Sequence, residues 1–180
     1  MVQDYSSHGV VFSRDLVSIA IVDDPGHAGK PPGLTFPGGR PKPKDRRDPK
    51  ETFFREVRME IGIPKSQLEI LGIIRDAKVV TIPGDEKNGI LPKEVLQYVY
   101  LGRALSDGIP DLKISGETLG WFWAPFNLRM PPEARGKRLY GTYRSLWRDD
   151  KFLEMTEPLY SNSGKYVEWW EEWRKSEAAH

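Results

Sequence analysis

Short apolar stretches separated by turn-forming residues fill the first third of the chain. Residues 10–13 and 16–22 are apolar and rich in β-branched side chains, and Arg14-Asp15 between them suits a tight hairpin turn. Residues 23–33 contain three prolines and three glycines, which is typical of a loop. A short apolar piece then runs into Pro37-Gly38-Gly39. The pattern predicts two paired strands, a loop and a short extended segment.

The ends of a helix are marked between residues 48 and 62. Asp48 suits the N-cap, Pro49 the first helical position, and Glu51 the third position of a capping box. Gly62 suits the C-terminal stop. These signals predict a helix from Pro49 to about Ile61.

Two faces of this helix differ in chemistry. Residues four apart lie on one face of a helix. One face is apolar and comprises Phe53, Val57 and Ile61. The other presents two carboxylates and comprises Thr52, Glu56 and Glu60. We therefore expect one face to pack into a core and the other to do chemistry or to meet solvent.

Later segments predict more strands and a second helical region. The clearest strand is 95–101, where β-forming residues predominate. Residues 68–82 predict one long or two short strands, 118–123 another strand, and the chain after 125 an irregular and then helical part. Strands, one helix, more strands and a terminal helix indicate an α+β fold with a mixed sheet.

Composition excludes several classes of site. The 180 residues include no cysteine, which excludes disulfides, thiolate zinc sites and cysteine nucleophiles. Only three histidines are present, so a site with several histidine ligands is not expected. We expect residues 1–180 to form one domain, with about 150–180 as a C-terminal helical extension.

Charge and hydropathy bear on partners and location. A net charge of +1 gives no overall attraction to a membrane and argues against long nucleic acid as a partner. The chain has no apolar run long enough for a transmembrane helix, and residues 1–7 lack the apolar core of a signal peptide. We expect a soluble cytoplasmic protein.

Glu56 and Glu60 are the first candidates for chemistry. Two carboxylates one turn apart repel each other, by about 0.2–0.5 kcal/mol on an isolated helix. A solvated acidic face paired with Arg55 and Arg58 would explain them, and so would a divalent cation, because Mg²⁺ binds one or two carboxylates together with substrate phosphates. Gly39 and a basic loop that begins at Arg40 precede the helix, and this context favours a phosphate substrate.

These residues resemble a known motif. Phe36-Pro37-Gly38-Gly39, followed by Arg-Glu-Val-Arg-Met-Glu-Ile-Gly-Ile at 55–63, is similar to the Nudix box. The sequence departs from that motif in three ways. The loop is two residues longer, and Met59 replaces one glutamate of the pattern. No glutamate stands at the acidic position early in the motif, where Asp45, Asp48 or Glu51 could serve instead.

The resemblance implies a fold and an activity. The fold would be a Nudix-like α/β/α sandwich with a mixed β-sheet. The activity would be Mg²⁺- or Mn²⁺-dependent hydrolysis of a diphosphate linkage in a nucleotide-type small molecule. Because Met59 takes the place of a glutamate, a catalytically weakened module that binds nucleotides or regulates is the alternative. The resemblance leaves a homodimer open as the assembly.

The resemblance also implies roles for individual residues. Glu56, Glu60 and the Gly39 carbonyl would hold the metal, and Glu117 would act as a base or complete the metal shell. Glu94, Asp85 and Glu86 are weaker candidates for the base. Arg40 and Arg55 would contact substrate phosphate, with Arg55 also bracing the loop through an acid, while Gly38 and Gly62 would be structural.

Aromatic residues leave the substrate open. A nucleobase could stack on Phe36 or on one of two strand pairs, although packing within the fold explains such residues equally well; the pairs are Tyr98 with Tyr100 and Trp121 with Trp123. A terminal aromatic face would dock on the sheet or on a partner, or cap a substrate pocket; it comprises Tyr166, Trp169, Trp170 and Trp173.

Overall fold

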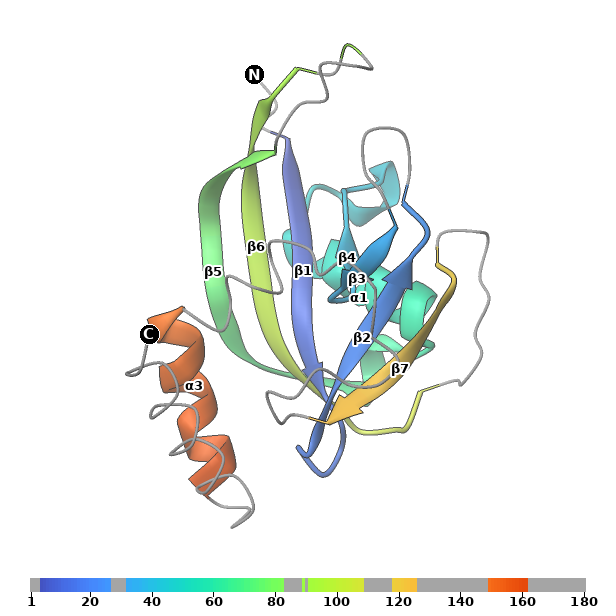
Figure 1. Ribbon diagram of the computed structural model, residues 1–180, viewed down its shortest axis with the longest axis vertical. Coiled ribbons are helices and arrows are strands. Elements are labelled where there is room, and N and C mark those ends of the chain that lie inside the picture. Colours follow the sequence, from blue (N-terminus) through green and yellow to red (C-terminus); the bar gives the residue numbers. More distant parts are fainter. Residues whose placement is uncertain are drawn as a thin grey trace.

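One mixed β-sheet runs through the chain in the computed structural model, which describes residues 4–26, 32–82, 89, 91–108, 118–125 and 149–161 (Figure 1). The strands are β1 (Tyr5–Phe12), β2 (Ser18–Asp24), β3 (Gly33–Thr35), β4 (Gly38–Gly39), β5 (Leu68–Ile82), β6 (Lys93–Ala104) and β7 (Gly120–Pro125). The helices are α1 (Pro49–Ile61) and α3 (Asp150–Ser161), with short 3₁₀ helices η1 (Pro43–Asp45) and η2 (Lys65–Gln67).

The strand order makes the sheet mixed. The central order is β3-β2-β1-β6-β5, and β4 and β7 pair with β1 and β2 respectively. β1 runs parallel to β6 over its whole length, from Tyr5 opposite Leu96 to Phe12 opposite Arg103, and the other pairs are antiparallel. The predicted mixed sheet is confirmed, and so is the hairpin that turns through residues 13–17.

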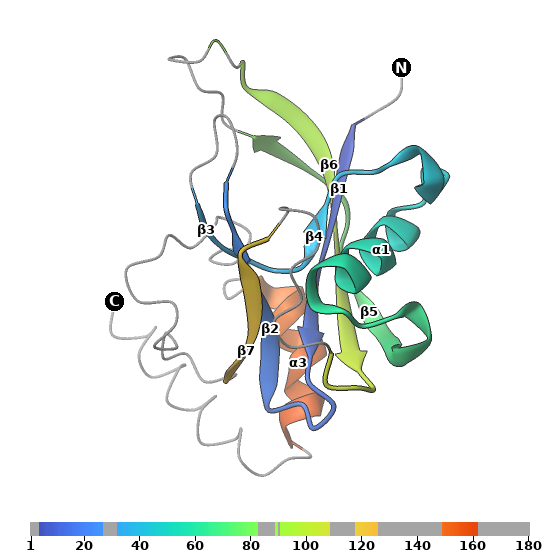
Figure 2. The same cartoon turned by 90° about the vertical axis from the view of Figure 1, so that its right-hand side faces the viewer.

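Both faces of the sheet are covered, which is the predicted α/β/α arrangement. Alternate residues of a strand point to opposite faces, so Val11 packs with Phe53 and Val57 of α1. Val10 instead belongs to a second apolar cluster that includes Phe152 of α3. In Figure 2, α1 lies along one side of the sheet, and α3 lies apart from α1.

Local signals set both ends of α1. The helix begins at Pro49 and ends at Ile61, as predicted. The Asp48 carboxylate accepts a hydrogen bond from the Lys50 backbone N–H at 2.8 Å, and Gly62 adopts the left-handed conformation with φ 74°. The capping-box role predicted for Glu51 is wrong: its carboxylate pairs with Lys65 at the surface, because η2 brings that amine alongside the helix.

The later strands agree with the prediction, with shifted ends. Residues 68–82 form a single strand whose pairing with β6 is interrupted by bulges, one of them between Arg75 and Lys78. β7 begins two residues later than predicted. The predicted helical region from about 150 is confirmed as far as Ser161, and the aromatic face predicted at 166–173 lies outside the described residues.

An ion pair between a buried arginine and a partly buried aspartate ties the start of α3 to the sheet. Arg75 of β5 donates to Oδ2 of Asp149 at 3.0 Å and to Oε1 of Gln97 at 2.8 Å. Arg75 and Gln97 are both buried. This contact fixes α3 over the face of the sheet opposite α1. Within the described ranges, no helix is long and apolar enough to cross a membrane.

Candidate active site

The carboxylates of Glu56 and Glu60 lie side by side against the backbone of β4. The two residues are only 5% and 8% exposed. Oε2 of Glu60 accepts a hydrogen bond from the Gly38 N–H at 2.8 Å. A Cβ on Gly39 would overlap Oε1 of Glu56, so this close approach requires glycine. The structure therefore brings together four residues that the sequence singled out: Gly38, Gly39, Glu56 and Glu60.

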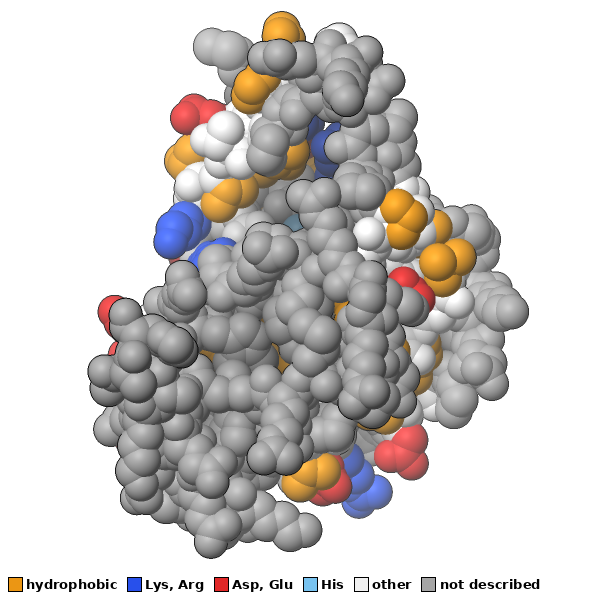
Figure 3. Space-filling view, viewed as in Figure 1, with side chains coloured by type: hydrophobic (Ala, Val, Ile, Leu, Met, Phe, Trp, Pro, Cys, Tyr) orange, Lys and Arg blue, Asp and Glu red, His pale blue; other side chains and the backbone are white. Residues whose placement is uncertain are grey.

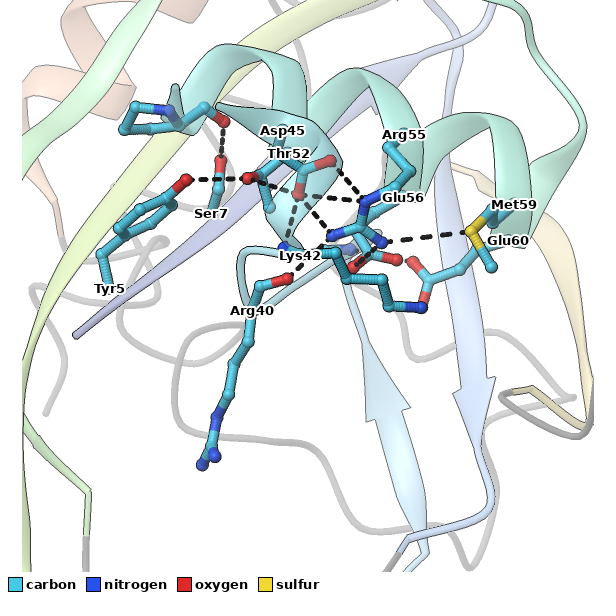
Figure 4. Close-up of polar contacts among 12 residues, drawn as sticks. Tyr5, Ser7, Arg40, Lys42, Asp45, Thr52, Arg55, Glu56, Met59 and Glu60 are labelled. Carbon is cyan, nitrogen blue, oxygen red and sulfur yellow. Dashed lines mark hydrogen bonds and ion pairs between the residues drawn. The ribbon is translucent and has the colours of Figure 1, made fainter. Parts of the chain in front are cut away.

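Arg55 is held by Asp45, which settles which of the three candidate acids pairs with it. Its Nε lies 2.9 Å from Oδ1 of Asp45, and its Nη2 donates to Oδ2 at 2.9 Å and to the Arg40 carbonyl at 2.8 Å. Its Nη1 donates to Oε1 of Glu56 at 2.6 Å. Arg55 thus connects the loop before α1 to a carboxylate of the pair, as Figure 4 shows.

Asp45 collects further donors from the loop and the helix. Its carboxylate accepts from the Lys42 backbone N–H at 2.8 Å and from the Thr52 hydroxyl at 3.0 Å. The Tyr5 hydroxyl lies 3.0 Å from Oγ1 of Thr52 and extends the network to β1. The sequence did not identify Tyr5, and the only available signal for Thr52 was its place on the helix face of Glu56 and Glu60.

The electrostatics follow from burial and pairing. Burial alone would raise the pKa of Asp45, but the hydrogen bonds from Arg55, the Lys42 backbone and Thr52 outweigh it and hold this pKa below its usual value. Burial would likewise lower the pKa of Arg55, but Asp45 and Glu56 raise it. Both groups are therefore charged at neutral pH.

Two further side chains lie near Arg55, Glu56 and Glu60, namely those of Met59 and Lys42. The Met59 sulfur lies 4.0 Å from Nη1 of Arg55, so a thioether stands where the Nudix pattern has a carboxylate. The Lys42 side chain extends toward the Glu56 and Glu60 side of the helix in Figure 4. Arg40 is exposed, and its side chain points away from the Asp45 cluster.

The residues present fit a hard divalent cation that shares its shell with a phosphate. No group of three or more His, Cys, Asp or Glu side chains is placed to hold a metal within the described part of the chain. Mg²⁺ often binds one or two carboxylates and completes its shell with water and substrate phosphates. Two buried carboxylates packed against Gly38 and Gly39 meet that requirement.

His8 of β1 lies close to this site and was not identified from the sequence. It pairs with Gly38 of β4, and a Cβ on that glycine would overlap Nδ1 of His8. His8 is the one histidine among the residues described, and Figure 3 shows a small pale-blue histidine surface on the face seen in that view. Because alternate residues of a strand face opposite sides, His8 shares the face of Val10, opposite α1.

The remaining predicted residues divide into buried, exposed and undescribed ones. Phe36 is fully buried and Tyr100 stacks on Phe53 with ring centroids 5.2 Å apart, so both serve packing. The rings of Trp121 and Trp123 pack edge to face on each other, and both residues lie against the apolar cluster that contains α1. Glu94 is exposed on β6. Three candidates for the base lie outside the described residues: Glu117, Asp85 and Glu86.

The family is shown by the sequence itself. Residues 10–143 match the model of the NUDIX domain. This chain belongs to the Nudix family. The match includes the loop, α1 and the carboxylate pair, so the Nudix box identified in the sequence lies in its expected structural context. Among curated proteins, none matches the chain.

Solved structures share the Nudix fold at low sequence identity. A NUDIX hydrolase from Nitrosomonas europaea is similar with a TM-score of 0.56 and 16% identity, covering 82% of this chain and 88% of that one. A C. elegans Ap4A hydrolase is similar with a TM-score of 0.53 and 19% identity, covering 84% of this chain and 98% of that one. A Nudix hydrolase from M. Smegmatis is similar with a TM-score of 0.58 and 10% identity, covering 87% of this chain and 88% of that one.

Proposed function

We propose that this Nudix protein hydrolyses a diphosphate linkage in a nucleoside diphosphate-linked small molecule, with Mg²⁺ or Mn²⁺ as cofactor. The observation that carries the proposal is the buried pair Glu56 and Glu60, held against the Gly38-Gly39 backbone. Two like charges taken out of water one turn apart need a cation to offset their repulsion. Arg55 supplies part of that offset to Glu56.

Each residue has a proposed task. Glu56, Glu60 and the Gly39 carbonyl would hold the cation, which when bound would neutralise the diphosphate and lower the pKa of a nearby water. Gly38 fixes Glu60 through its N–H, and Arg55 fixes Glu56 through Nη1. Because four donor contacts of Arg55 are already directed at Asp45, Glu56 and Arg40, we assign Arg55 to positioning rather than to substrate phosphate.

Arg40 is proposed as the phosphate contact. Its backbone is fixed by Arg55 while its guanidinium is exposed and directed away from the Asp45 cluster. Glu117 remains the proposed base or further metal ligand. The nucleotide class of substrate is supported by the family and by the Ap4A hydrolase among the similar structures.

Met59 favours a second candidate function, a nucleotide-binding module with weakened catalysis. Its sulfur occupies the neighbourhood of Arg55 without supplying a charged oxygen ligand. The retained Glu56 and Glu60 pair favours the hydrolase, because a binding module without metal has no need for two buried like charges.

Turnover separates the two functions. The protein would be incubated with Mg²⁺ or Mn²⁺ and nucleoside triphosphates, ADP-ribose, sugar nucleotides, dinucleoside polyphosphates, NADH and coenzyme A, with products resolved by chromatography. We expect cleavage of at least one diphosphate linkage, and the products name the bond. Tight binding of a compound without cleavage of any would instead establish the binding module.

A further inference from the structure

Thr52 of α1 connects the acid and arginine network of the site to strand β1. Its side chain is fully buried. Its Oγ1 donates to Oδ2 of Asp45 at 3.0 Å and lies 3.0 Å from the Tyr5 hydroxyl of β1. Tyr5 and Thr52 both lie outside residues 36–39 and 55–63, which carry the Nudix box. The connection to β1 therefore depends on residues outside the motif.

The number of available protons fixes the direction of these hydrogen bonds. A hydroxyl group has one proton to donate, and an ionised carboxylate can only accept. The pKa of Asp45 lies below its usual value, so the Thr52 hydroxyl donates its one proton to an ionised carboxylate. The Tyr5 hydroxyl must then donate to Oγ1 of Thr52. Each hydrogen bond of such an ordered chain polarises and strengthens the next.

The chain of hydrogen bonds ends at a carboxylate of the proposed metal site. Asp45 accepts from Nε and Nη2 of Arg55, both at 2.9 Å, and these two contacts fix the plane of the guanidinium. Because the guanidinium is a rigid planar group, its Nη1 is aimed at the same time. Nη1 donates to Oε1 of Glu56 at 2.6 Å. The orientation of Glu56 thus depends on Thr52 through two intervening side chains, as can be followed in Figure 4.

The whole chain of contacts is shielded from water. Its members are all buried: Tyr5, Asp45, Thr52, Arg55 and Glu56. A hydrogen bond is stronger in such surroundings, and water does not replace a partner that is lost. Removing the Thr52 hydroxyl would leave Tyr5 without its acceptor and Asp45 with one donor fewer. The loss should therefore be felt at Arg55 and at the carboxylate that it holds.

Strand β1 also holds the other parts of the site. Oγ of Ser7 donates to the Pro49 carbonyl in the first turn of α1 at 2.6 Å, and Ser7 pairs with Gly39 of β4. The ring of Tyr5 packs edge to face on Tyr98 of β6, with ring centroids 5.8 Å apart. One strand therefore contacts both the start of the helix and the Gly39 backbone, and its Tyr5 is itself anchored to the sheet.

We propose that Thr52, held by Tyr5, is a positioning residue for metal binding. Its hydroxyl fixes the orientation of the Glu56 carboxylate through Asp45 and Arg55, so that the carboxylate is already in place when the cation arrives. This inference rests on the proposed metal site. Partners that orient a metal ligand typically change metal affinity or activity about 10- to 100-fold when they are mutated.

Met59 makes such positioning more important in this chain. A thioether replaces a carboxylate of the Nudix pattern and supplies no charged oxygen. The affinity for a hard cation then depends more strongly on how Glu56 and Glu60 are oriented, because fewer ligands share the task.

The test measures the affinity for Mn²⁺ alone, without substrate or turnover. Metal-free protein is titrated with Mn²⁺, and electron paramagnetic resonance of the unbound ion gives Kd for the wild type and four variants. Thr52→Val removes the hydroxyl and keeps the shape, Thr52→Ser keeps the hydroxyl, and Tyr5→Phe removes the outer donor. Thr156→Val is the matched control, because Thr156 of α3 is also fully buried and its hydroxyl donates to the Phe152 carbonyl at 2.8 Å.

We expect Thr52→Val to weaken Mn²⁺ binding about five- to ten-fold, less than a direct partner of the ligand would, because the effect passes through two side chains. Tyr5→Phe should weaken binding about two- to three-fold, and Thr52→Ser and Thr156→Val by less than about two-fold. Both valine variants should melt at a lower temperature, because each lacks a buried hydrogen bond. Only the loss of Mn²⁺ affinity therefore identifies the positioning role.

Three results would overturn the inference: an affinity of Thr52→Val within about two-fold of the wild type, an equal loss in Thr156→Val, or no recovery in Thr52→Ser. If Thr52→Val does not fold, Tyr5→Phe decides, and an unchanged affinity overturns the inference. A wild type that binds no Mn²⁺ refutes the metal site together with the inference. A wild type that binds Mn²⁺ but cleaves no compound refutes the hydrolase alone.

Discussion

Replacing Asp45 by asparagine should destabilise this protein more than any change at a surface acid. The Asp45 carboxylate accepts hydrogen bonds from three different groups: the Arg55 guanidinium, the Lys42 backbone N–H and the Thr52 hydroxyl. Asparagine keeps the size of the side chain but removes its charge. Arg55, itself only 9% exposed, then retains its charge without the carboxylate that lies 2.9 Å from its Nε.

The size of the effect follows from the burial of both partners. Removing one member of a buried ion pair typically costs about 3–5 kcal/mol, because the other charge stays buried without compensation. Glu56 still contacts Arg55, so the lower end, about 3 kcal/mol, is expected. Exposed pairs contribute only about 0–1 kcal/mol, which makes Glu51→Gln, paired with Lys65 at the surface, the matched control.

Urea unfolding monitored by tryptophan fluorescence measures both variants. The loss for Asp45→Asn should also depend on pH in a defined direction. Because the folded pKa of Asp45 lies below the unfolded value near 3.8, its stabilisation is complete above that pH and disappears as the pH falls through the folded pKa. The two proteins should therefore converge in stability under acid. A loss below about 1 kcal/mol at pH 7, or one equal to that of Glu51→Gln, would refute the reasoning.

Two further predictions follow from other contacts. Gly39→Ala should lower the apparent metal affinity about 10- to 100-fold with little change in melting temperature, because the new Cβ displaces the Glu56 carboxylate; metal titration of turnover checks this, and unchanged affinity would contradict it. Arg75→Met should cost about 3 kcal/mol of unfolding free energy, because it leaves Asp149 without its buried partner. Lys93→Met, which breaks the exposed pair with Asp4, should cost about 1 kcal/mol or less. Equal losses of the two variants in chemical denaturation would contradict the role of Arg75 in anchoring α3.

The parts of the fold that sequence predicted are those decided by local chemistry. α1 was predicted from its first to its last residue because Asp48, Pro49 and Gly62 act within one turn of its ends. The strands followed from β-forming runs. The parallel pairing of β1 with β6 could not be predicted in this way, because it joins segments about ninety residues apart through the packing of the whole sheet.

The site was predictable to a similar extent. Glu56 and Glu60 were found from helical spacing and from the box, and the structure places both against Gly38-Gly39. The sequence offers three acids as the partner of Arg55. Only the structure identifies Asp45, because η1 places its side chain in the interior beside Arg55. Tyr5 reaches the Asp45 cluster only through a tertiary contact with Thr52, and His8 lies beside Gly38 only through strand register; no sequence spacing reveals either.

The most direct test of metal-dependent hydrolysis is a Mg²⁺ titration of turnover for four proteins: the wild type, Glu56→Gln, Glu60→Gln and Glu154→Gln, whose substitution lies at an exposed position of α3. The substrate is the compound cleaved in the panel. The account predicts saturable Mg²⁺ dependence for the wild type and Glu154→Gln, and rates at least about 100-fold lower for the other two, with all four proteins folded at the assay temperature. Wild-type turnover without a divalent metal, or full activity in Glu60→Gln, would contradict it.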